Sequence, residues 1–156
     1  MYTGAPAAYH SDVQCLVIAA SLLLGAAGLM AGGADRDQLI GAWETGGDGD
    51  GHVIWTLRAN GDVLHIARVE NERKLVDFEC NTVGRECAVK DAGKPMKVSL
   101  WFNGPKLVMM ETHGNDVVKR RFQATGDGKE IEMEIIPIVP QGKTETVHLK
   151  RAPASN

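Results

Sequence analysis

The side chains of residues 35–156 that could do chemistry are four histidines (His52, His65, His113 and His148) and two cysteines. No Gly-x-Ser-x-Gly nucleophile motif and no His-Glu-x-x-His zinc motif accompanies them. His65 and His148 fall inside expected strands, where they could meet across a barrel and bind a metal ion; surface histidines are the simpler interpretation. We therefore expect no catalytic residue, no metal site and no cofactor, and we expect a protein that is not an enzyme.

The densest basic run is Lys119-Arg120-Arg121. Successive side chains of a strand point to opposite faces, so these three do not form one patch. Arg120 shares a face with Phe122, and if Phe122 points inward then Arg120 does too. A buried arginine needs a partner. That partner could be an internal acid such as Glu111 or the carboxylate of a ligand.

Cys80 and Cys87 lie on segments that the sequence predicts to be antiparallel neighbours. A metal site would need two further ligands nearby, and a redox site usually has the spacing Cys-x-x-Cys. In an oxidising compartment two nearby cysteines usually pair. The sequence therefore predicts a structural disulfide between them.

Residues 1–34 have the pattern of a secretory signal peptide. An apolar run from Cys15 to Met30 is followed by Gly32-Gly33-Ala34, which predicts cleavage after Ala34. No lysine or arginine precedes the run, so an uncleaved N-terminal membrane anchor is the alternative. We expect an exported protein, periplasmic or extracellular, whose domain spans residues 35–156 and which contacts a membrane only through the N-terminal segment.

The strand pattern indicates an all-β protein. Turn signals recur every 8 to 12 residues or so, as in sandwiches and barrels, and no helical period is evident after residue 34. The clearest alternation places Ile131, Met133 and Ile135 on one face of a strand. We predict an antiparallel up-and-down meander of eight or nine strands. Closure into a barrel would remove exposed edges and is the favoured form, and a sandwich is the alternative that periodicity alone leaves open. The net charge of −3 argues against a nucleic-acid partner.

A Gly-x-Trp motif, Gly41-Ala42-Trp43, lies on the first expected strand and is followed by the meander. In this the chain resembles the lipocalin-like (calycin-type) small exported β-barrel domains of bacteria. The resemblance covers residues 35–156 in layout and Gly41 and Trp43 in motif. It implies a basic residue near the end of the last strand, stacked on the tryptophan, for which Arg151 or Lys150 is in the right order.

The resemblance also implies a small apolar or amphipathic ligand inside the barrel. A filled barrel acting as a structural or protein-interaction module is the alternative, with no particular protein partner indicated. An open apolar interior would favour the first and a packed interior the second. We expect the inward face to contain one charged group, Arg120, available to the acid head of a ligand, among apolar side chains that include adaptable methionines: Trp55, Leu57, Val98, Leu100, Met109, Met133 and Ile135.

Overall fold

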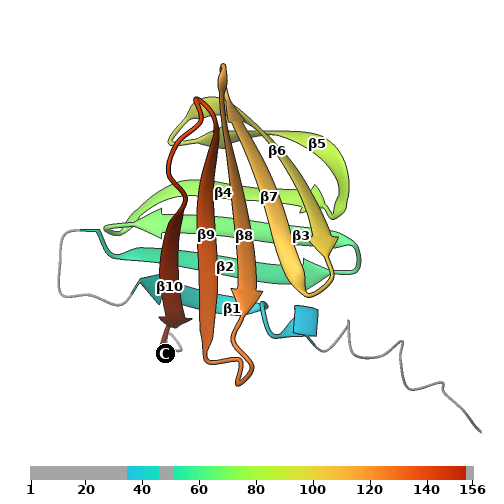
Figure 1. Ribbon diagram of the computed structural model, residues 1–156, viewed down its shortest axis with the longest axis vertical. Helices are drawn as coiled ribbons and strands as arrows, with labels where there is room; N and C mark the ends of the chain where they lie inside the picture. Colours follow the sequence, from blue (N-terminus) through green and yellow to red (C-terminus); the bar gives the residue numbers. More distant parts are fainter. Residues whose placement is uncertain (1–34, 46–50, 154–156) are drawn as a thin grey trace, which may run out of the picture.

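The computed structural model describes residues 35–45 and 51–153 (Figure 1). A single helical turn at residues 35–37 precedes ten strands. The strands are β1 (Gly41–Thr45), β2 (Val53–Asn60), β3 (Val63–Glu70), β4 (Arg73–Asn81), β5 (Val83–Asp91), β6 (Lys94–Asn103), β7 (Lys106–His113), β8 (Asp116–Ala124), β9 (Glu130–Val139) and β10 (Glu145–Arg151).

The strands form one closed antiparallel barrel in which each pairs with its neighbours in sequence and β1 pairs with β10. In Figure 1, β7 to β10 run in front of β1 to β4 and cross them steeply, so the barrel is built from two layers that share one core.

The predicted all-β meander and its closure into a barrel are confirmed. The predicted number of eight or nine strands is wrong, because β5 is a strand in its own right. Six of its nine residues are exposed, so the sequence shows it only as a return of the preceding strand.

Alternation of inward apolar and outward polar residues builds the core, as the period of two requires. On β6, Met96, Val98 and Leu100 are buried. On β9, Ile131 and Met133 are buried while Glu132 between them is exposed. Side chains from both layers meet between the sheets and form one apolar cluster.

The seam between β4 and β5 differs from the other seams of the barrel. The two strands share one register pair, Val76 with Asp91, whereas β3 and β4 share eight. Cys80 and Cys87 bridge this seam, with Cα atoms 6.0 Å apart. The predicted pairing of the two cysteines therefore joins strands that have few backbone hydrogen bonds between them.

The predicted signal peptide, residues 1–34, lies outside the residues that the structure describes. Within residues 35–45 and 51–153, no helix is long and apolar enough to cross a membrane.

Candidate functional site

One end of the barrel is organised around Trp43, which is fully buried. Its indole Nε1 donates a hydrogen bond of 2.8 Å to the carbonyl of Leu39, which is itself buried in the core. The guanidinium of Arg151 stacks over the Trp43 ring at 4.2 Å from its centroid. The resemblance implied a basic residue at this position and left Arg151 and Lys150 open; the guanidinium of Arg151 lies there.

Arg151 also ties this end of the barrel to the segment before β1. It donates hydrogen bonds to the carbonyls of Gln38, Ile40 and Gly128, each between 3.1 and 3.2 Å. Gly41 adopts a positive φ of 139°, and a Cβ at this position would lie 2.6 Å from Nη1 of Arg151. The backbone conformation therefore favours glycine here, and any larger residue would also force the end of the Arg151 side chain to shift.

The opposite end of the barrel, where β1 ends and β2 begins, is open. A hollow of about 220 Å³ lies there, which we call the mouth. Four residues predicted to face a ligand line it, namely Trp55, Arg120, Met133 and Ile135. The remaining lining residues, not singled out by the sequence, are Thr45, Val53, Arg68, Glu70 and Val147.

The other four predicted ligand contacts, Leu57, Val98, Leu100 and Met109, do not line the mouth. Each is at most 1% exposed and belongs to the packed core. They do face inward, as the alternation predicts. They lie deeper in the barrel, where side chains from the two layers fill the space.

Arg120 points into the barrel and forms an ion pair with Glu111. Its Nε donates to Oε2 of Glu111 at 3.0 Å, and the two side chains are 14% and 3% exposed. The Arg120 guanidinium also lies 5.6 Å from the centroid of the Trp55 ring. Of the two partners that the sequence left open, an internal acid or a ligand, the structure provides the internal acid.

A second arginine, Arg68, also forms an ion pair with an acid of the barrel and also lies close to the Trp55 ring. Its Nη2 donates to both carboxylate oxygens of Asp91, at 2.9 and 3.1 Å, and its guanidinium lies 5.5 Å from the Trp55 centroid. The sequence analysis missed Arg68. Its spacing from Leu64 and Ile66 on β3 gives the signal that could have found it, because alternate residues of a strand share a face.

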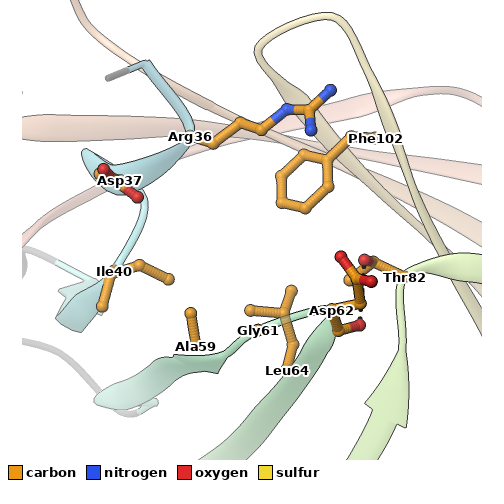
Figure 2. A pocket seen from close by; sticks show the side chains of 9 residues that line it. All are labelled: Arg36, Asp37, Ile40, Ala59, Gly61, Asp62, Leu64, Thr82 and Phe102. Atoms are coloured by element: carbon orange, nitrogen blue, oxygen red, sulfur yellow. Dashed lines mark hydrogen bonds between the residues drawn. The ribbon is translucent and has the colours of Figure 1, made fainter. Parts of the chain in front are cut away.

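A second hollow, of about 160 Å³, lies at the Trp43 end of the barrel (Figure 2). The Phe102 ring faces it, together with Leu64 and the carboxylate of Asp62. The guanidinium of Arg36 stacks on Phe102 at 4.5 Å and donates to the carbonyl of Gly104. Arg36, from the segment before β1, already covers the Phe102 ring. We therefore assign this hollow to the closed, Trp43 end of the barrel and not to a ligand site.

The histidines do not converge. His65 lies on the outer face of β3, where its Nε2 is 2.6 Å from Oδ1 of Asp77. His148 lies on β10 next to buried Leu149 and is exposed, so it also faces outward. The two histidines therefore do not meet across the barrel. In the part of the chain that the structure describes, no group of three or more potential ligands is placed to hold a metal ion.

No family model and no curated protein matches the sequence. Solved structures do match. A secretory abundant heat soluble protein from Ramazzottius varieornatus aligns at 15% identity over 73% of this chain and 94% of its own, with a TM-score of 0.61. A fatty acid binding protein of Schistosoma mansoni, solved in complex with arachidonic acid, aligns at 13% identity over 76% and 99%, with a TM-score of 0.60.

Fatty-acid-binding protein 1 of Echinococcus granulosus gives a TM-score of 0.62 at 5% identity, covering 75% of this chain and 99% of that one. The fold is calycin-like. At these identities the likeness shows the fold alone.

Proposed function

We propose that this protein binds a small apolar or amphipathic molecule in the mouth of its barrel. The observation that carries the proposal is the mouth itself, a hollow of about 220 Å³ walled mainly by apolar side chains with a few fixed polar groups. A concave apolar site with a small number of placed polar contacts is the usual form of a small-molecule site. Several solved proteins of the same fold are named as fatty-acid-binding proteins, which supports the proposal by analogy.

The size of the mouth limits the ligand. Pockets that enclose drug-sized molecules usually measure about 300 to 1,000 Å³, and the mouth is smaller than this. Below it, the interior is filled by core side chains such as Leu57 and Val98. The ligand is therefore short, or it inserts only its apolar end.

The packed interior also supports the second candidate, a filled barrel that acts as a protein-interaction module without a ligand. The two candidates differ in one respect that can be measured. Only ligand binding in the mouth requires that a side chain which fills the mouth should weaken the binding of an apolar probe.

The test is titration with N-phenyl-1-naphthylamine, a neutral apolar dye whose fluorescence rises on leaving water. Val147→Phe adds an aromatic ring at a residue that lines the mouth. His148→Phe adds a ring to the outer face of the same strand and is the matched control. We expect the wild type and His148→Phe to bind the dye and Val147→Phe to bind it at least about tenfold more weakly, because truncating or filling an apolar site is worth about 1 to 3 kcal/mol. A wild type that does not bind, or a Val147→Phe variant that binds equally well, would favour the interaction module.

We further propose that the protein is exported to the periplasm or the outside of the cell and belongs with small exported lipocalin-like domains of bacteria. The signal-peptide pattern of residues 1–34 and the cysteine pair support this. Mass spectrometry of the protein from its own host tests it. The expected mature chain begins at Asp35, and a cytosolic chain that keeps residues 1–34 would contradict it.

A further inference from the structure

The charges around the mouth are already paired. Each of its two arginines holds an acid of the barrel itself: Arg120 holds Glu111, and Arg68 holds both oxygens of Asp91. The acid side chains are 3% and 19% exposed, so both pairs lie largely out of water. Glu70 is a third carboxylate, and it lines the mouth directly, whereas Glu111 and Asp91 reach it only through their arginines. The three acids outnumber the two arginines by one, so the mouth has no excess positive charge for an anion.

A ligand carboxylate would therefore enter at a disadvantage. It would lose its hydration and approach acids that already occupy the arginines, and both effects disfavour a charged group in a partly buried site. The arginines keep N–H donors that these pairs do not use, but Glu111 and Asp91 already balance their charges. A carboxylate that bound there would add a negative charge with no cation to balance it.

An uncharged polar head would not be repelled by these acids. The Nε of Arg68 is buried and makes no hydrogen bond within the residues that the structure describes. A hydroxyl, ester or amide oxygen would reach this buried atom after a shift of the Arg68 side chain, and it would accept the hydrogen bond without adding charge. The apolar remainder of the molecule would contact the side chains of Met133, Ile135 and Val147, which line the same hollow.

We infer that the mouth selects ligands with an uncharged polar head over carboxylates, and that Glu111 sets this preference by neutralising Arg120. The inference rests on the proposed function and names the ligand class of the same site. Glu111 is the specificity-determining residue, because its carboxylate balances the charge of the guanidinium that would otherwise attract an acid head.

The experiment compares 1-octanol with octanoate, which have the same chain and differ in the charge of the head. Each competes with N-phenyl-1-naphthylamine for the intact protein at neutral pH and low salt. We expect octanol to displace the dye at least about tenfold more effectively from the wild type. In Glu111→Gln, which frees the charge of Arg120, octanoate should gain at least about tenfold, on the scale of a hydrogen bond to a charged group, while octanol changes little.

Glu134→Gln is the matched control. It removes an acid from the Arg121–Glu134 pair, whose Nη2–Oε1 distance is 2.8 Å and which lies on the outer face of β8 and β9. It makes the same change in net charge without touching the mouth. The inference requires that octanoate binding stay unchanged in this variant. An equal gain in Glu134→Gln and Glu111→Gln would overturn it, because the effect would then be one of overall charge.

The wild-type comparison keeps the inference testable even if Glu111→Gln does not fold. Octanoate that binds the wild type as tightly as octanol would overturn the inference and leave the proposed function standing. A wild type that binds the dye but releases it to neither octanol nor octanoate would overturn the inference and would leave the proposed function standing. If the wild type binds none of the three molecules, the proposed function itself fails.

Discussion

Substitution of Gly41 tests how the Trp43 end of the barrel is stabilised. Its φ of 139° belongs to a region that residues with a Cβ rarely adopt, and an added Cβ would lie 2.6 Å from Nη1 of Arg151. Gly41→Ala therefore imposes two separate costs, one on the backbone and one on the arginine. The backbone cost is about 1 to 3 kcal/mol, as for other residues held in sparsely populated conformations.

The second cost follows from what Arg151 must give up when it moves. Its stacking on Trp43, at 4.2 Å, is worth about 0.5 to 1 kcal/mol at an exposed position. It also holds three backbone carbonyls, whose hydrogen bonds weaken together when the guanidinium shifts. Adding these contributions to the backbone cost, we expect Gly41→Ala to lower the free energy of unfolding by about 2 to 4 kcal/mol.

Urea unfolding of a double-mutant cycle separates the two costs. In Gly41→Ala/Arg151→Ala the contact is already absent, so the double variant should lose about 0.5 to 1.5 kcal/mol less than the sum of the single variants. Gly61→Ala is the control: its φ is +58° and no atom lies within 4 Å of the added Cβ, so it carries a backbone cost of only about 1 to 2 kcal/mol. Additivity within about 0.3 kcal/mol would refute the contact with Arg151. A loss no greater than that of Gly61→Ala would refute the reasoning as a whole.

Two further predictions concern other parts of the barrel. Replacing Cys80 and Cys87 together by serine should lower the free energy of unfolding by about 2 to 3 kcal/mol, the scale for a short closed loop. Thiol labelling of the unreduced, denatured protein should find neither cysteine free, and two free thiols would contradict the bridge. The pKa of Asp77 is lowered, chiefly by its hydrogen bond from Lys74, so its stabilising contribution is present above its ordinary pKa of 3.8 and is lost as the pH falls through the lowered value. Asp77→Asn should therefore cost less than about 1 kcal/mol at pH 7, since the pair is solvent-exposed, and urea unfolding at several pH values should show this difference shrinking in acid.

The sequence predicted those features that follow from the period of a strand. The alternation that places Ile131 and Met133 in the core is local, so it can be read without knowledge of the fold. The same rule placed Arg120 inward beside Phe122 and named Glu111 as one possible partner. The structure puts both side chains on the same side of the barrel wall.

The features that the sequence did not predict depend on contacts between distant strands or on interrupted patterns. β5 is exposed along most of its length, so no apolar period marks it as a strand. Arg68 continues the inward positions of Leu64 and Ile66, but its partner Asp91 lies on β5, and local alternation does not indicate a pair between such distant strands. The boundary between mouth and packed core depends on how the two layers fill the space between them, and for that reason Leu57 and Met109 could not be distinguished from Trp55 and Met133 by pattern alone.

The position of the two inner ion pairs argues for a role in binding rather than in folding. A largely buried ion pair stabilises a protein little compared with apolar side chains of similar volume, yet removing one partner typically costs about 3 to 5 kcal/mol. If stability were the purpose, apolar residues would serve as well at these positions. Both pairs instead flank Trp55 at the open end, with each arginine within 5.6 Å of its ring centroid. Two ion pairs placed around one aromatic ring at the open end fit the ligand site that we propose there, because they would discriminate between small molecules by charge.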